Sequence, residues 1–121
     1  MYLEIDFNSN EAIYVQVRNQ IIMEIAYSNI REGDSLPSVR QMANILGINM
    51  HTVNKAYGIL REEGYIQLDR RRGAVICVDP DKERLLKEIK STMNIVIAQG
   101  RCKNITREDI HRLVDDIFDE Y

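Results

Sequence analysis

The stretch Leu36–Leu60, LPSVRQMANILGINMHTVNKAYGIL, decides the fold of this chain because it has the pattern of two short helices around a tight turn. Ser38, with Gln41 three residues later, predicts a capping box that starts the first helix. Gly47 supplies the left-handed residue that ends this helix, and Asn49 is the expected N-cap of the second. Both helices have an apolar face at i, i+3, i+4 and i+7, made by Val39, Met42, Ala43 and Leu46 and then by Val53, Ala56, Tyr57 and Leu60. This pattern predicts a helix-turn-helix unit.

The same stretch contains no acidic residue. From Ser35 to Arg61 there is no Asp or Glu, and the charged side chains are Arg40, Lys55 and Arg61, whereas the whole chain has a net charge of −3. A carboxylate on a surface that faces DNA would repel the phosphates. The local absence of carboxylates on an acidic protein therefore favours a DNA-binding surface.

Hydrogen-bonding side chains gather in the first turns of the second helix, which is the part of a recognition helix that reaches base edges. These candidate DNA contacts are Asn49, His51, Thr52, Asn54 and Lys55. Thr52 and Lys55 are spaced to share a face opposite the apolar stripe. Ser38 and Arg40, at the start of the first helix, are further candidates, and we expect Arg40 to contact phosphates. His51 has the alternative of being an ordinary surface residue.

Upstream of this unit the pattern is again helical. Residues 11–28 have an apolar stripe, and Ser9 or Asn10 is the expected cap. The stripe consists of Tyr14, Val17, Ile21, Ile22 and Ile25. Before it, apolar residues alternate in 2–7, which predicts an extended arm or an edge strand. The helix is expected to be the supporting first helix of a three-helix unit.

Downstream, Gly64 is expected to end the second helix, and two β-rich runs follow at 65–68 and 74–78. Two short runs around a loop that contains Gly predict a β-hairpin. A hairpin directly after a recognition helix is the wing of a winged helix. Its expected tip carries the further DNA-binding candidates Arg70, Arg71, Arg72 and Gly73. We expect the arginines to contact phosphates, with at least one in the minor groove, although a solvated turn is the alternative.

Asp79-Pro80-Asp81 predicts a boundary between a winged helix-turn-helix domain (1–79) and a helical tail (80–121). The tail has two helical patterns, one from about 81 to 99 with Gly100 as its stop, and one that starts at the N-cap Thr106. About forty residues in two helices are not expected to enclose a metabolite pocket of roughly 300–1,000 Å³. The tail is expected to form a homodimer, because helix-turn-helix proteins usually bind two half-sites with two-fold symmetry. Packing within one chain is the alternative. The candidate dimerisation residues are Ile89, Met93, Val96, Ile97, Ile110, Leu113, Val114, Ile117 and Phe118.

The segment from Tyr14 to Ile76 resembles the DNA-binding domain of the GntR family of bacterial transcription regulators. The matching residues are Ile13-Tyr14, Gln16, Gly33-Asp34, Leu36-Pro37-Ser38-Val39-Arg40, Ala43, Leu46-Gly47, Thr52-Val53, Ala56-Tyr57, Leu60, Glu63-Gly64-Tyr65-Ile66 and Gly73. The family usually has Ser-Arg where this chain has Asn49-Met50, so one arginine contact of the family has no counterpart here. Asn49, Thr52-Val53 and Lys55-Ala56-Tyr57 are nearer to the short YtrA-like branch.

The resemblance implies a winged helix followed by a small helical dimerisation tail, without a large effector domain. It also implies a transcription regulator, most often a repressor, with inverted-repeat operators that frequently control transporter genes. The expected fold class is thus mainly α with a small β-hairpin. The expected partners are double-stranded operator DNA and a second copy of the chain, and the residues identify no small-molecule effector.

Other function classes find little support in the residues. His51 and His111 are the only histidines, and neither has a partner at a catalytic spacing. Cys77 and Cys102 follow no metal-binding spacing, so we expect no enzyme activity, metal or cofactor. No apolar run approaches the roughly 18 residues that span a bilayer, and the N-terminus lacks a signal-peptide pattern, so the expected location is the cytoplasm with no membrane partner. The alternative function is a winged-helix module that binds protein, whose surface would carry exposed apolar residues.

Overall fold

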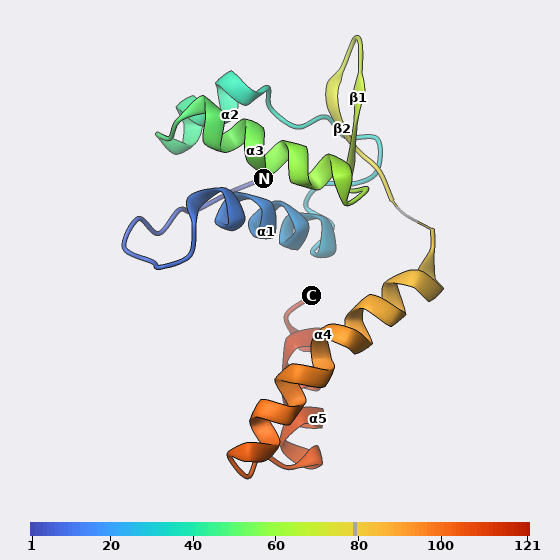
Figure 1. Ribbon diagram of the computed structural model, residues 1–121. Coiled ribbons are helices and arrows are strands. Elements are labelled where there is room, and N and C mark those ends of the chain that lie inside the picture. Colours follow the sequence, from blue (N-terminus) through green and yellow to red (C-terminus); the bar gives the residue numbers. More distant parts are fainter. Residues whose placement is uncertain (79) are drawn as a thin grey trace. The chain divides into compact units, whose positions relative to one another are not determined.

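The chain folds into two units, Met1–Asp79 and Pro80–Tyr121, in a computed structural model that describes residues 1–78 and 80–121 (Figure 1). The elements are, in order, α1 (Ile13–Ala26), α2 (Val39–Leu46), α3 (Met50–Glu62), β1 (Ile66–Asp69), β2 (Gly73–Ile76), α4 (Lys82–Cys102) and α5 (Arg107–Asp119). Three helices and a hairpin followed by two helices confirm the predicted fold class. The predicted boundary falls on Asp79, which lies outside the described residues.

The helix-turn-helix has the predicted local chemistry. The Ser38 hydroxyl oxygen accepts from the backbone N–H of Gln41 at 3.1 Å, and the Gln41 side chain accepts from the Ser38 N–H at 3.0 Å. Gly47 ends α2 with φ 68°, in the left-handed region that favours glycine. The Asn49 side-chain oxygen then accepts from the N–H of His51 at 2.7 Å and starts α3. These contacts fix both ends of the turn between the helices.

The core of the first unit is built around the buried face of α3, which packs against α1 and α2. Its buried apolar residues are Val17, Ile21, Ile30, Leu36, Met42, Ala43, Val53, Ala56, Tyr57, Leu60, Ile66, Ala74, Val75 and Ile76. The Tyr57 hydroxyl donates to the carbonyl of Pro37 at 2.7 Å, which joins α3 to the segment that leads into α2. Burial raises the pKa of Tyr57 well above its usual range.

The hairpin follows α3 through Gly64, whose φ is 87°. β1 and β2 pair antiparallel from Ile66 opposite Ile76 to Asp69 opposite Gly73. The segment before α2 pairs with the other edge of β2, through an N–H of Leu36 to Ala74 and an N–H of Ile76 to Asp34, both at 2.8 Å. β2 therefore lies between β1 and residues 34–36, a pairing that the sequence pattern did not predict.

The first helix begins later than predicted, at Ile13. Its N-cap is Ala12, which provides no side-chain hydrogen bond, so the prediction of Ser9 or Asn10 as the cap was wrong. The Ser9 hydroxyl instead accepts from the N–H of Glu11 at 3.0 Å, in the turn before the helix. Backbone torsion at Ala12 rather than a side-chain contact sets the start of α1.

Residues 2–7 form an extended arm and not a strand, which settles the alternative left open by the sequence. Leu3 and Ile5 pack against the core, whereas Phe7 is exposed. Two glutamines of α1 hold the arm. Gln16, which is buried, accepts from the N–H of Asp6 at 2.9 Å and donates to its carbonyl at 3.0 Å. Gln20, one turn later, accepts from the N–H of Glu4 at 2.7 Å and donates to the Glu4 carbonyl.

In the second unit, α4 continues through Gly100, so the prediction that this glycine ends the helix was wrong. The helix ends where Asn104 takes φ 62° and the N–H of Ile105 donates to the Gly100 carbonyl at 2.9 Å. The Ile105 side chain lies 3.3 Å from the position that a Cβ on Gly100 would occupy. Gly100 therefore allows the chain to turn closely over the last part of α4. Thr106 is the N-cap of α5, as the sequence predicted, and it forms a capping box with Asp109.

No residue of α4 or α5 that the structure describes is buried. Large apolar side chains stand open on both helices, at Leu86, Ile89, Met93, Ile95, Val96, Leu113, Ile117 and Phe118. The second unit thus has no hydrophobic core of its own. Among the described helices, none combines the length and the apolar character that crossing a membrane requires.

Candidate nucleic-acid interface

The outer face of α3 carries the residues predicted to contact base edges. His51, Asn54 and Lys55 are exposed, on the side of the helix opposite the buried stripe of Val53 and Leu60. Thr52, which was predicted to share a face with Lys55, is only half-exposed and so lies nearer the edge of this face. His51, Asn54 and Lys55 are therefore the fully exposed candidates on this helix.

Lys55 is held to one side of that face. Its ammonium group lies 4.0 Å from the centre of the Tyr14 ring, a cation–π contact between α3 and the first turn of α1. The sequence could not show it, because Tyr14 and Lys55 lie far apart in the chain.

The first turn of α2 presents Ser38 and Arg40, both exposed, with no acidic residue in that turn. Ser38 uses its oxygen as an acceptor in the capping box, and a hydroxyl that accepts one hydrogen bond can still donate another. Arg40 extends from the helix start without a nearby carboxylate in the sequence. This pair can therefore donate to a phosphate oxygen.

The wing tip is organised by Asp69. Its carboxylate oxygen accepts from the backbone N–H of Arg71 at 2.8 Å and of Arg72 at 3.0 Å. These hydrogen bonds stabilise the ionised carboxylate and lower the pKa of Asp69. The carboxylate therefore stabilises the turn. Gly73, with φ 74°, closes the loop at a position where a side chain would be strained. The three arginines stand on this fixed loop and are all exposed.

The three wing arginines do not have the same role in the structure. The Arg72 guanidinium donates to the carbonyl of Gly33, in the turn that precedes the segment paired with β2. Arg72 thus holds the wing to the body of the domain. Arg70 and Arg71 remain as the side chains that the tip presents, because neither makes a hydrogen bond through its guanidinium among the described residues.

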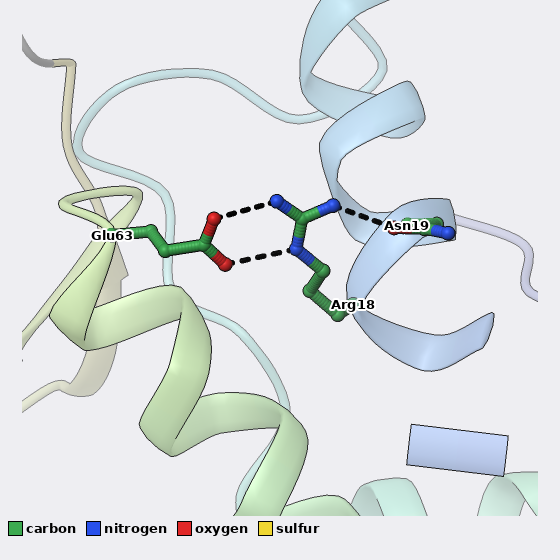
Figure 2. A network of polar contacts seen from close by, with 3 residues as sticks. All are labelled: Arg18, Asn19 and Glu63. Atoms are coloured by element: carbon green, nitrogen blue, oxygen red, sulfur yellow. Dashed lines mark hydrogen bonds and ion pairs between the residues drawn. The ribbon is translucent and has the colours of Figure 1, made fainter. Parts of the chain in front are cut away.

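A bidentate ion pair braces the opposite end of α3. The Arg18 guanidinium contacts the Glu63 carboxylate through Nε at 2.9 Å and Nη2 at 2.6 Å, and its Nη1 donates to Asn19 at 2.6 Å (Figure 2). The hydrogen bonds to Glu63 raise the pKa of Arg18. This contact fixes α1 against the end of α3 and pairs a carboxylate that lies just beyond the acid-free stretch. No sequence signal identified it.

The candidate dimerisation residues lie on two open stripes of the second unit. Ile89, Met93 and Val96 of α4 and Leu113, Ile117 and Phe118 of α5 are exposed, while Ile97, Ile110 and Val114 are partly covered. Near the α4–α5 turn the helices border an open groove of about 560 Å³, lined in part by Ile97, Arg101 and Ile110. This groove is open and not an enclosed cavity, so the expectation that so short a tail does not enclose a metabolite pocket stays a prediction. Exposed large apolar side chains also occur on the winged unit, at Met1, Tyr2, Phe7, Met23, Ile45, Met50, Leu68 and Val78.

Comparisons with known proteins agree with this geometry. Residues 13–76 match the family model "Bacterial regulatory proteins, gntR family". The chain is 31% identical to the transcriptional repressor YtrA of Bacillus subtilis, over 95% of this chain and 91% of that protein. A transcriptional antiterminator of Listeria monocytogenes has a similar structure, with a TM-score of 0.86, 27% identity and coverage of 97% and 90% of the two chains. YtrA of Sulfolobus acidocaldarius, a GntR-family transcription factor, is 34% identical with a TM-score of 0.60 and coverage of 98% and 97%.

The family match covers the whole helix-turn-helix and hairpin, and the relatives span the tail as well. These relatives are regulators of transcription and not enzymes. The chain therefore belongs to the GntR family, as a transcriptional regulator with a winged helix-turn-helix DNA-binding domain and a short helical tail of the YtrA type.

Proposed function

We propose that this protein represses transcription by binding an inverted-repeat operator as a homodimer. The observation that carries the proposal is the surface of α2 and α3, which has no carboxylate between Ser35 and Arg61 on a chain with a net charge of −3. Neutralisation of phosphates dominates the affinity of proteins for DNA, so such a surface suits the duplex. Residues 1–79 would form the DNA-binding domain and 80–121 the dimerisation tail.

The exposed side chains divide between two kinds of contact. His51 and Asn54 are exposed near the start of α3 and would contact base edges in the major groove. A second set, at the start of α2, in the first turns of α3 and on the wing, would contact the backbone: Ser38, Arg40, Asn49, Thr52, Lys55, Arg70, Arg71 and Gly73. Arg72 would support the wing from behind through its bond to Gly33.

The open tail supports the homodimer. Six exposed apolar side chains of the candidate set would be covered by a second copy, and full burial of one such side chain contributes roughly 1.5–3 kcal/mol. Lost freedom on association offsets part of this gain. Two copies also place two recognition helices on two half-sites, which explains why an inverted repeat is the expected operator.

The regulatory outcome rests on the relatives. The Bacillus protein that matches most of this chain is named a transcriptional repressor, and a dimer seated on an operator would exclude polymerase from the promoter. The resemblance to the short YtrA-like branch supports a transporter operon as the target. A regulator that binds an operator would work in the cytoplasm.

Selection of bound sequences from a random pool of duplex DNA tests the proposal. We expect enrichment of an inverted repeat and protection of both half-sites, and a reporter behind this operator should fall in output when the protein is present. His51→Ala or Asn54→Ala should reduce the ratio of operator to scrambled-DNA affinity, at roughly 1–3 kcal/mol per lost base contact. Asn94→Ala, at an exposed position of α4, is the matched control. A pool without enrichment would refute DNA reading and favour a protein-binding module.

A further inference from the structure

One glycine of the chain is explained neither by its backbone conformation nor by its packing. Four of the six glycines have a positive φ, which glycine adopts without strain: Gly33, Gly47, Gly64 and Gly73. Gly100 is helical, and a Cβ there would lie 3.3 Å from the Ile105 side chain. Gly58 lies in the interior of α3 and faces open space. Apart from its chain neighbours and the helix backbone, no heavy atom of the described residues lies within 4 Å of the position that its Cβ would occupy.

Glycine at this position weakens the helix. It is less favourable in a helix interior than every other residue type except proline, because its backbone loses the most freedom on folding. An alanine at this point would meet open space, so it would stabilise α3 without a clash. A glycine that costs stability and serves no contact within the described chain indicates a role outside it, because glycine also lets another molecule approach the backbone closely.

Gly58 lies on the side of α3 that carries candidate DNA contacts. His51, Lys55 and Gly58 are separated by four and then three residues, so they follow one another along one side of the helix. All three are exposed. The fully buried Val53 and Leu60 lie on the opposite side. The glycine therefore continues the outward surface that begins at His51.

Two cations flank the glycine at a distance of one turn. Lys55 precedes it by three residues and Arg61 follows it by three, and both are exposed. The Arg61 guanidinium makes no hydrogen bond or ion pair with the residues that the structure describes. Glu62, the first carboxylate after the acid-free stretch, limits this cationic span at the end of the helix. A bare helix surface between two cations suits a phosphate of the DNA backbone.

The dimensions of the duplex agree with this position. An α-helix rises about 1.5 Å per residue, so Gly58 lies roughly 10 Å along the axis from His51. The major groove of B-DNA is about 12 Å wide and about 8.5 Å deep, so a helix whose start touches base edges passes the phosphate backbone within a similar distance. Gly58 is therefore at the point of α3 where the two backbones would come closest.

We propose that a DNA phosphate lies against α3 at Gly58, between Lys55 and Arg61, and that Arg61 contacts this phosphate. The inference rests on the proposed function, in which α3 enters the major groove. It adds two residues to the candidate interface, and they act in different ways. Arg61 donates to the phosphate, whereas Gly58 is a positioning residue, because the missing side chain sets how deeply the helix can enter the groove.

Gly58→Ala and Gly58→Leu in the full chain test the close approach. The probes are two fluorescein-labelled duplexes, one of mixed sequence at low salt and one enriched in the selection described above, and binding is measured by fluorescence anisotropy. We expect affinity for both duplexes to fall about twofold to threefold with alanine and at least about tenfold with leucine, whose side chain would separate the helix from the phosphate. Gly58→Ala should at the same time raise Tm by roughly 4–8 °C, because alanine favours the helix.

Ala98→Leu is the matched control, because Ala98 is an exposed helical residue of α4 outside the winged unit. It adds the same bulk as the step from alanine to leucine at Gly58 and should leave affinity unchanged. Arg61→Ala should lower the slope of log affinity against log salt by about one, whereas Lys103→Ala should not. An unchanged slope for Arg61→Ala would overturn the phosphate contact assigned to this arginine.

Higher Tm together with weaker DNA binding is the result that supports the role of Gly58, because a folding defect would lower both. If Gly58→Leu binds both duplexes as tightly as the unchanged chain, no phosphate lies against the glycine and the inference is overturned. If Gly58→Ala lowers both Tm and affinity, the fold itself needs the glycine, which also overturns it. Failure of the proposed function looks different, since the selection would then enrich no duplex and the unchanged chain would not bind the mixed sequence.

Discussion

Tyr57 holds the two helices of the DNA-binding unit at their angle, and Tyr57→Phe tests this role. Its hydroxyl donates to the Pro37 carbonyl at 2.7 Å, and the side chain is 6% exposed. The substitution removes one hydrogen bond and leaves a partly buried carbonyl without its partner. Such a loss costs roughly 0.5–1.5 kcal/mol of unfolding free energy, which lowers Tm by about 4–8 °C per kcal/mol in a domain of this size.

The same contact gives the stability a specific dependence on pH. Burial favours the neutral phenol, so the pKa of Tyr57 is higher in the folded chain than in the unfolded one. Above a pH of about 10 the unfolded chain loses this proton first, and the free energy of unfolding falls by up to roughly 1.4 kcal/mol per pH unit. Tyr57→Phe lacks this contribution. An advantage of about 1 kcal/mol below pH 10 should therefore disappear near pH 11.

Chemical denaturation of the unchanged chain and the variant at several pH values between 7 and about 11 measures both effects. Tyr2→Phe is the matched control, because Tyr2 is 77% exposed and its loss should change neither quantity. Equal stability of Tyr57→Phe and the unchanged chain at neutral pH would refute the structural role of the hydrogen bond. A difference that stayed constant to pH 11 would refute the argument from burial.

Three further outcomes are expected. Arg40→Ala should weaken binding to all DNA sequences similarly and lower the slope of log affinity against log salt by about one, while Lys103→Ala outside the winged unit should not; an unchanged slope would exclude a phosphate contact by Arg40. A double-mutant cycle on Arg18 and Glu63 should give a coupling energy of roughly 0.5–1 kcal/mol that decreases with salt, and zero coupling would show that this partly exposed pair is neutral for stability. Gln16→Leu should cost roughly 1–3 kcal/mol of unfolding free energy and speed amide exchange in the arm, since the N–H of Asp6 loses its acceptor; full retention of protection would contradict the glutamine contacts.

The helix-turn-helix was predictable because its limits rest on local backbone chemistry. Ser38 with Gln41, Gly47 and Asn49 each satisfy or release backbone groups within a few residues, so the pattern needs no tertiary information. The end of α4 was predicted wrongly, because it depends on packing and not on local backbone chemistry alone. Gly100 stays helical because Ile105 closes over it, and Asn104 takes the left-handed conformation that was assigned to the glycine. Only the packing of the turn decides between these two positions.

The composition of the candidate interface could be read from the sequence, but its contacts could not. The acid-free stretch predicts a DNA-binding surface, whereas the positions of Lys55 over Tyr14 and of Arg72 on Gly33 depend on contacts across the fold. Gln16 carried no signal for burial either. A glutamine on a helix is usually exposed, and its partners are backbone groups of Asp6 and Glu11, which no side-chain pattern reveals.

The pairing of β2 with both β1 and residues 34–36 has a mechanical consequence. The strand that carries the wing is bonded directly to the segment that enters α2, and Arg72 adds a second tie to Gly33. The wing and the helix-turn-helix are therefore joined, and the distance between the wing tip and α3 is set by these hydrogen bonds. If the wing and α3 contact neighbouring grooves as proposed, bending or overwinding of the duplex would change how well both contacts can form at once. The affinity would then depend on the sequence-dependent flexibility of the DNA as well as on its base pairs.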